Sequence, residues 1–312
     1  MQGLEASRRW YETAGAPMLE REFGDVAGRI AVGRAGHGSE CFGFDDAVSR
    51  DHDFVTGFCL WIPDGDEGDY GFRLERAYAR LRKEFPPDPV SGTAAGSSEL
   101  GEAEHGVTTV GAFYRRHLGF PGAPQNWRQW LGTPEHAFAE AVNGEVFRDD
   151  LGVFSGVRET ILNGMPEDVR RKKIAARAVF MAQSGQYNYP RCLRHGEPGA
   201  AALALDEFVR NAARMVFLLN RRFAPYYKWV FRAMRTLPKL SECAGELEAL
   251  LARGGSGETI SDGIEAVCAK IAAELRGQGL SGCEDAYLEP HAFEVQSSIR
   301  DREIRALHIM EG

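Results

Sequence analysis

Several features that define whole classes of protein are missing from this sequence. No stretch of its 312 residues approaches the roughly 18 consecutive apolar residues that a membrane-spanning helix needs. Residues 1–23 contain acidic and basic side chains and no apolar segment of the signal-peptide type. We therefore expect a cytoplasmic protein with no membrane segment.

Metal-binding and disulfide patterns are missing as well. The six cysteines include no C-x-x-C pair and no zinc-ligand spacing, so in a cytoplasmic chain they are predicted to be reduced, packed thiols. Six of the eight histidines show no ligand spacing such as H-E-x-x-H: His105, His117, His136, His195, His291 and His308. These patterns predict no structural metal centre.

An excess of basic residues, the usual mark of nucleic-acid binding, is also absent. Lys and Arg total 37 and Asp and Glu total 45, so the formal charge, 37 − 45, is −8. This balance argues against a general nucleic-acid binder but leaves room for a local basic pocket. A hydrophobic content of 44% with 26% charged residues is typical of a folded globular chain.

The chain divides into two parts of different pattern. Residues 86–106, rich in Pro, Gly, Ser and Ala, predict a long surface loop, and residues 254–257 a short helix breaker. In the first part, helices are expected over 4–23, interrupted at Gly15 and Pro17, and over 70–84; strands are expected over 29–34, 51–62, 107–110 and 144–147. From residue 155 on, the pattern predicts helices, over 166–184, 200–220, 225–237, 241–253 and 261–276.

These elements predict an α+β protein of two domains. Residues 1–154 would form a small domain with a mixed sheet, and residues 155–312 an α-helical bundle that closes over its face. Asn220 is placed to cap the helix over 200–220. The helix over 261–276 has an apolar stripe formed by Ile264, Val267, Cys268, Ile271 and Leu275.

Residues 36–54, GHGSECFGFDDAVSRDHDF, carry the clearest chemical pattern. Gly38 and Ser39 follow a predicted strand, and their backbone amides would cradle phosphates if they open a helix. After eleven further residues the next predicted strand opens with Asp51 and Asp53, whose side chains share a face because strand side chains alternate. Two adjacent carboxylates repel each other unless a cation lies between them, and hard oxygen ligands suit Mg²⁺. The combination indicates phosphoryl or nucleotidyl transfer.

Each half of this pattern also has a simpler interpretation. A Gly-Ser pair is usually only a turn, and D-x-D at the start of a strand is more often solvated than metal-bound. His52 would point away from the two carboxylates, which predicts a core or supporting group rather than a base. His37, directly before the turn, could touch a phosphate.

Gly-Ser, a spacer of this length and Asp-x-Asp on a strand together resemble the signature of the polymerase-β-type nucleotidyltransferase superfamily, which includes the aminoglycoside and minimal nucleotidyltransferases. The wider sequence, including the downstream segments QSGQYNYPR and LLNRRFAPYYKW, is similar over most of the chain to a bacterial family of that superfamily classed as a domain of unknown function. The resemblance implies a nucleotidyltransferase domain over 1–154. It also implies that Gly38 and Ser39 bind the triphosphate of ATP or another nucleotide, and that Asp51 and Asp53 are catalytic and coordinate Mg²⁺.

Active members of this superfamily usually have a third carboxylate on a later strand, and this sequence does not place one. The expected strand over 107–110 carries none, Glu102 and Glu104 fall in the long loop, and Glu145 and Asp149 come late in the chain. This departure leaves open a nucleotide-binding or regulatory protein that has lost catalysis.

The helical half offers candidates for a substrate cleft. Arg170, Lys173 and Arg177 are spaced to share one helix face, which is either a solvated basic face or a surface that meets the nucleotide. Just past that helix, polar and aromatic side chains cluster, and the candidates among them are Gln186, Tyr187, Asn188 and Arg191.

A second downstream cluster contains one more nucleotide-binding candidate. Lys228 could reach a phosphate as a point charge. Its aromatic neighbours Tyr226, Tyr227 and Trp229 are predicted to belong to the bundle core instead.

The function that these patterns favour is an Mg²⁺-dependent nucleotidyltransferase. It would move a nucleoside monophosphate, AMP from ATP, onto a hydroxyl group and release pyrophosphate. The acidic charge favours a small-molecule acceptor over tRNA or DNA. The alternatives are the catalytically degenerate protein and an adenylyltransferase that modifies a hydroxyl of a partner protein.

Overall fold

The computed structural model describes residues 3–46, 56–86, 105–252 and 256–312. Asp51, His52 and Asp53, and nearly all of the loop expected over 86–106, lie outside the described residues. The chain forms two compact units: unit 1 contains Met1–Gln125 and Ala137–Gly164, and unit 2 contains Asn126–His136 and Met165–Gly312. The predicted division into 1–154 and 155–312 makes each unit one continuous segment, whereas in the structure residues 126–136 belong to unit 2 and residues 137–164 return to unit 1.

Unit 1 is built on a four-stranded mixed sheet, which with the helices confirms the predicted α+β class. The strands are β1 (Ala31–Arg34), β2 (Cys59–Ile62), β3 (Gly106–Thr109) and β4 (Glu145–Arg148). Their order is β3-β2-β1-β4; β1 runs antiparallel to β2 and β4, and β2 runs parallel to β3.

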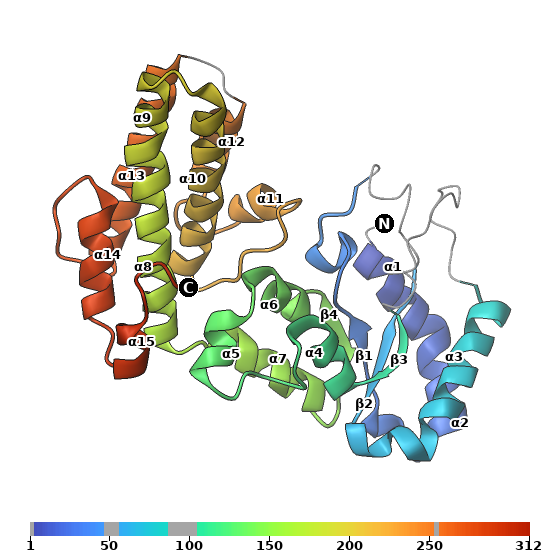
Figure 1. The fold of residues 1–312 in the computed structure, drawn as a ribbon. Coiled ribbons are helices and arrows are strands. Elements are labelled where there is room, and N and C mark those ends of the chain that lie inside the picture. The colour runs from blue at the N-terminus through green and yellow to red at the C-terminus, as the bar shows by residue number, and fades with distance from the viewer. Residues whose placement is uncertain (1–2, 47–55, 87–104, 253–255) are drawn as a thin grey trace. The chain divides into compact units, whose positions relative to one another are not determined.

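Helices cover both faces of this sheet (Figure 1). On one face α1 (Gly3–Trp10), α2 (Ala16–Phe23) and α3 (Phe72–Glu84) pack on the alternate strand residues Val32, Leu60 and Ile62. On the other face Trp61 meets α4 (Val110–Leu118) and α7 (Val153–Asn163), and its ring stacks on Phe154 at 3.8 Å between centroids. The two central strands, β1 and β2, are buried along their whole length, and β2 is continuously apolar rather than alternating, whereas the edge strands β3 and β4 are mostly half-buried.

Two local expectations for unit 1 need correction. The helix over 4–23 is not broken at Gly15, because a π-helical turn over Tyr11–Gly15 joins α1 to α2. Gly15 is needed there because a Cβ atom would lie 2.5 Å from the ring of Phe58. The strand expected over 51–62 begins only at Cys59 within its described part.

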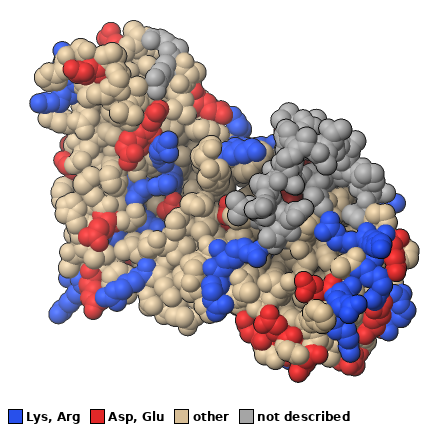
Figure 2. Space-filling view, turned by 45° about the vertical axis from the view of Figure 1, so that its right-hand side comes forward, with Lys and Arg blue, Asp and Glu red and all other residues tan. Residues whose placement is uncertain are grey.

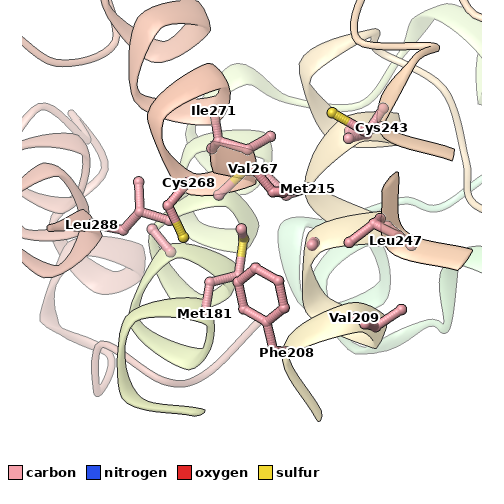
Figure 3. Close-up of a cluster of buried hydrophobic side chains, with 14 of the residues drawn as sticks. Met181, Phe208, Val209, Met215, Cys243, Leu247, Val267, Cys268, Ile271 and Leu288 are labelled. Carbon is pink, nitrogen blue, oxygen red and sulfur yellow. The ribbon is translucent and has the colours of Figure 1, made fainter. Parts of the chain in front are cut away.

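Unit 2 is helical. It contains α5 (Trp127–Gly132), α8 (Glu167–Met181), α9 (Tyr189–Arg194), α10 (Pro198–Leu219), α11 (Val230–Met234), α12 (Cys243–Leu251), α13 (Gly257–Gly277), α14 (Leu288–Ser297) and α15 (Arg302–Ala306). Helix α6 (Glu135–Val142) begins in unit 2 and continues into unit 1. In Figure 3, side chains of α8, α10, α12, α13 and α14 converge on one apolar core.

Several predictions for unit 2 are confirmed. The five residues of the apolar stripe on α13 are all buried, and Asn220 caps α10, with its amide Nδ2 donating to the carbonyl of Val216 at 2.8 Å. All six cysteines are free thiols. The helix expected over 225–237 is wrong in extent, since only Val230–Met234 are α-helical. Within the described residues, no helix combines the length and apolar character that a membrane span requires.

Lys172 is a fully buried cation that holds the end of the chain against α8. Its ammonium donates to Oε1 of Gln296 at 3.0 Å and to the carbonyls of His308 and Ile309 at 2.7 and 3.0 Å. Burial lowers the pKa of Lys172 from 10.5 to about 8.

This depressed pKa predicts a specific effect of alkaline pH on stability. Between pH 8 and 10.5 the unfolded chain binds more protons at this lysine than the folded chain, so the free energy of unfolding should rise with pH, by about 3 kcal/mol. The variant Lys172→Met lacks the titrating group, and the rise should be missing from it. Urea unfolding of both proteins at several pH values measures the difference. Equal pH slopes would contradict the prediction.

Candidate functional site

The predicted Gly-Ser turn lies at one end of the sheet in unit 1. By strand register, Arg34 at the end of β1 stands opposite Glu145, and Gly33 stands opposite Cys59, which in turn pairs with Gly106. This Gly-Ser end of the sheet is therefore formed by the last residue of β1 and the first residues of β2, β3 and β4. The segment from Ala35 to Ser39 leaves β1 directly at this place.

The turn is fixed by the side chain of Asn143, the residue directly after α6. The amide of Asn143 binds both polar groups of the Gly36 backbone: Oδ1 accepts from its N–H at 2.9 Å, and Nδ2 donates to its carbonyl at 2.7 Å. Gly36 and Gly38 both have φ of +115°, a backbone conformation that side-chain-bearing residues rarely adopt. At Gly38 a Cβ atom would also lie 2.6 Å from Oε2 of Glu40.

A buried ion pair lies directly beneath the turn. The guanidinium of Arg34 donates through Nη2 to Oε1 of Glu40 at 2.5 Å, and both residues are nearly inaccessible to solvent, at 5% and 6% exposed. A buried carboxylate without a partner would be costly, so Arg34 neutralises the charge that Glu40 places beside Gly38. The pair joins β1 to the turn that follows it.

The helix expected to open at Ser39 is much shorter than a phosphate cradle of the usual kind. Only a single 3₁₀ turn, Glu40–Phe42, follows Ser39, and Gly43 ends it in the left-handed conformation with φ of +68°. The carbonyl of Ser39 accepts from the N–H groups of Phe42 and Phe44 at 3.2 and 2.8 Å. The dipole of a full helix is therefore not available here, and any anion would be held by the amides of the turn itself.

Two histidines and a glutamate meet beside the turn, and sequence reasoning missed them as a group. Nδ1 of His37 lies 2.8 Å from Oε2 of Glu140, and Nδ1 of His117 lies 3.9 Å from the same oxygen. Burial, and then the neighbouring His37, lowers the pKa of His117 to about 4, so its ring is neutral at physiological pH. The three residues lie far apart in sequence, on the turn, α4 and α6, so no local spacing could reveal them.

A small cavity opens next to this group. It has a volume of about 90 Å³ and is lined by residues of the sheet end and of α4, among them Gly36, Cys59, His105, Arg116 and His117. At about 30 Å³ per water molecule this space holds a few waters or part of a ligand. Polar side chains and backbone thus surround a space at the point where the sequence predicts a reaction.

Asp51 and Asp53 fall in the segment 47–55, outside the described residues, so their predicted role stays a prediction. Among the described residues that flank this segment, Asp46 is exposed, whereas Asp45 and Thr56 are buried. A carboxylate oxygen of Asp45 accepts from the N–H of Gly3 at 2.9 Å, and Thr56 stands three residues before β2.

The four carboxylates considered as a third acidic ligand differ in their positions and contacts. Glu102 and Glu104 lie outside the described residues. Glu145 is not remote from β1, although it comes late in the chain, because β4 pairs directly with β1; its carboxylate binds Arg8 at 2.5 Å. Asp149 accepts from the N–H of Ser155 at 2.7 Å, near the start of α7.

The basic residues predicted on one face of α8 are buried, which contradicts a solvated face. Arg170 binds Glu167 through two hydrogen bonds of 3.0 and 2.8 Å, and Lys173 donates to the carbonyl of Leu131 at 3.1 Å. Arg177 donates to Oδ1 of Asn211 at 3.0 Å and to the carbonyl of Gly312. Each cation already has partners inside unit 2, and contact of Arg170 or Lys173 with a nucleotide stays a prediction.

In the polar and aromatic cluster after α8, one residue connects neighbouring helices and the others are exposed to solvent. Gln186 joins α13 to α14, since its Nε2 donates to Glu265 at 2.7 Å and its Oε1 accepts from the N–H of Leu288 at 2.9 Å. Tyr187, Asn188 and Arg191 are exposed, and the guanidinium of Arg191 binds the hydroxyl of Tyr187 at 2.9 Å.

The aromatic residues around Lys228 are not core residues as predicted. Tyr226 and Tyr227 are 45% and 69% exposed, and their rings lie 4.2 Å apart. Tyr226 and Tyr227 line a cavity of about 230 Å³ in unit 2, together with His136, Arg210 and Arg214 among others. Lys228 is exposed, with its ammonium 5.1 Å above the ring of Trp229.

Residues 130–230 match a family described as a domain of unknown function (DUF4037). The segments QSGQYNYPR and LLNRRFAPYYKW fall inside the matched residues, so the predicted similarity to such a family is supported there. The Gly-Ser and Asp-x-Asp motif falls outside them.

Other comparisons add little to this picture. A search of curated proteins finds no significant match. A solved structure of a nucleotidyltransferase-like protein from Exiguobacterium sibiricum 255-15 matches with a TM-score of 0.37 and 14% sequence identity, over 92% of this chain and 80% of that one. Similarity at this level does not transfer the activity of that protein to this chain.

Proposed function

We propose that the protein is a nucleotidyltransferase that binds a nucleoside triphosphate at the Gly-Ser end of the sheet. The observation that carries the proposal is the turn after β1. A buried strand leads into two glycines with φ of +115°, and the turn is clamped by Asn143 and supported by the Arg34–Glu40 pair. The nucleotidyltransferase motif that the sequence resembles has a Gly-Ser turn in this position, followed by Asp-x-Asp on a strand.

The chemistry assigned to the site has three parts. The backbone amides around Gly38 and Ser39 would contact the triphosphate, and this close approach requires that residue 38 has no side chain. Asp51 and Asp53 would hold Mg²⁺, which neutralises phosphate charge when it is bound. In the transfer, a hydroxyl oxygen of the acceptor would lose its proton to water and bond to the α-phosphorus of ATP. The bond from that phosphorus to the oxygen bridging the α- and β-phosphates would break, and pyrophosphate would leave.

The distribution of charge favours a small molecule as the acceptor. The formal charge is −8, and acidic and basic side chains lie interspersed on the face seen in Figure 2 rather than in a broad basic surface. A long nucleic acid would be repelled by this charge balance. Incubation with ATP labelled in the α-phosphate tests the class of acceptor, because only transfer to a protein leaves label on a protein band.

Replacing Gly38 with Ala should impair binding of the nucleotide. A Cβ atom at φ of +115° is strained, and it would collide with the carboxylate of Glu40, so the turn must move. We expect a loss of affinity for a non-hydrolysable ATP analogue of at least about tenfold and a stability loss of about 1–3 kcal/mol.

Gly43→Ala is the matched control. Gly43 also has positive φ, at +68°, but no atom lies within 4 Å of the added Cβ. This variant should lose about 1–2 kcal/mol of stability from strain alone and keep its affinity. Calorimetric titration of the two variants with the ATP analogue separates the effect of backbone strain from that of the shape of the turn. Equal affinities of Gly38→Ala and Gly43→Ala for the analogue would argue against a nucleotide at Gly38.

A further inference from the structure

The residues His37, Glu140 and His117 come from three separate elements and direct their ligand atoms to one point. The nearest ligand atoms, one from each residue, all lie within 4.8 Å of one another. Oε2 of Glu140 stands between the histidines, 2.8 Å from Nδ1 of His37 and 3.9 Å from Nδ1 of His117. Donors held by one ion at about 2.1 Å stand roughly 3.0–3.5 Å apart, so the longest of these separations must shorten by about 1 Å when an ion binds.

The buried histidine gives an independent reason to expect a ligand. The side chain of His117 is only 3% exposed, and its Nδ1 makes no hydrogen bond to any described residue. An unpaired buried polar atom destabilises the folded state, and the 3.9 Å gap between Nδ1 of His117 and Oε2 of Glu140 is too long for a hydrogen bond. A ligand that bridges Glu140 and His117 would satisfy this atom, whereas the contact between His37 and Glu140 leaves it unsatisfied.

The chemistry of the three donors selects the ligand. Two imidazole nitrogens and one carboxylate oxygen form a borderline set that suits Zn²⁺ and related transition-metal ions, whereas Mg²⁺ prefers oxygen ligands alone. Three protein ligands leave at least one further position on the ion, as in catalytic rather than structural zinc sites.

The surroundings leave room for this further ligand. The side chain of His37 is 55% exposed, so the cluster borders on solvent, and His117 also lines the cavity of about 90 Å³. A water molecule or an anionic group of a bound molecule could therefore occupy the open position.

We propose that His37, Glu140 and His117 form a binding site for one divalent transition-metal ion of the Zn²⁺ class, with an open coordination position, directly beside the Gly-Ser turn. This site uses none of the residues assigned to Mg²⁺, Asp51 and Asp53, and it does not depend on the proposed nucleotidyl transfer. Because His37 precedes Gly38, an ion held there would lie close to any phosphate bound at the turn.

Titration of the metal-free protein with Co²⁺ tests the site directly. We expect one Co²⁺ ion to bind tightly to each protein molecule, with the visible absorption of a low-symmetry cobalt site formed by nitrogen and oxygen ligands. Zn²⁺ should displace this ion, and an excess of Mg²⁺ should not. A near-ultraviolet charge-transfer band would instead indicate that one of the cysteines binds the metal. The proposal would be overturned if no Co²⁺ ion bound tightly. The appearance of this charge-transfer band would overturn it as well.

Variants identify the ligands and separate this proposal from the proposed function. Glu140→Gln and His117→Ala should each weaken binding by at least about 10–100-fold, whereas replacement of the exposed His195 by Ala should leave it unchanged. The double variant Asp51→Asn/Asp53→Asn should bind Co²⁺ like the wild type even if it no longer binds nucleotide. Undiminished binding by Glu140→Gln would contradict the site, provided that circular dichroism shows the variant to be folded.

Discussion

Replacing both Asp51 and Asp53 with Asn is expected to reduce pyrophosphate release from ATP by at least about 1,000-fold. The amide keeps the size of each side chain but removes the negative charge that would hold Mg²⁺ against the triphosphate. The proposed reaction has no other assigned metal ligands, so the loss should appear in kcat rather than only in KM. A coupled assay of pyrophosphate release by the wild type and the double variant measures the effect.

The exposed carboxylate Asp25 supplies the control for this experiment. Asp25→Asn makes the same chemical change on the surface of unit 1, after α2, and should keep full activity. Full activity in the double variant would refute the assignment of the acidic pair. An inactive wild type that still binds nucleotide would favour the degenerate binding protein.

The second large effect is expected at the ion pair under the Gly-Ser turn. Replacing Arg34 with Met leaves the carboxylate of Glu40 buried without its partner, which should lower the free energy of unfolding by about 3–5 kcal/mol. The further change Glu40→Gln removes the stranded charge, so the double variant should recover a large part of this loss. Urea unfolding of the two single variants and of the double variant gives the coupling between the residues.

A surface pair tests whether burial causes the effect. Arg235 and Glu248 also form an ion pair, but their side chains are about half exposed. Arg235→Met should therefore cost no more than about 1 kcal/mol. If Arg34→Met were equally mild, the carboxylate of Glu40 would have found solvent or another partner, and the turn would not depend on this pair.

Much of the fold could be predicted because its signals are local. The apolar stripe of α13 and the cap at Asn220 follow from the period of the helix and from the chemistry of its ends. The strands β1, β3 and β4 were expected within one or two residues of where they lie. Helices α4 and α6 escaped prediction; both are short, and α6 runs from one unit into the other.

The environment of charged and aromatic side chains could not be predicted from spacing alone. Lys173 and Arg177 have the pattern of an exposed face, yet both are buried because Leu131, Asn211 and Gly312, remote in sequence, supply acceptors. The pair Tyr226 and Tyr227 has the composition of a core, but the short α11 begins only after it and leaves both rings exposed.

The candidate site shows the same limit. A spaced motif pointed to Gly38 and Ser39, because a turn after a strand is a local feature. His37, His117 and Glu140 are brought together only by the packing of α4 and α6 beside the end of β1, and no pattern within one segment marks them. A buried polar atom without a partner is visible only once the surroundings of His117 are known.

The central claim, that a nucleoside triphosphate binds at the Gly-Ser end of the sheet, is tested most directly by calorimetric titration. Wild-type protein is titrated with a non-hydrolysable ATP analogue with and without Mg²⁺, and the double variant Asp51→Asn/Asp53→Asn is titrated in the same way. The proposal predicts saturable binding that requires Mg²⁺ and that the double variant loses. Absence of binding to this analogue and to the analogues of the other nucleoside triphosphates would contradict it.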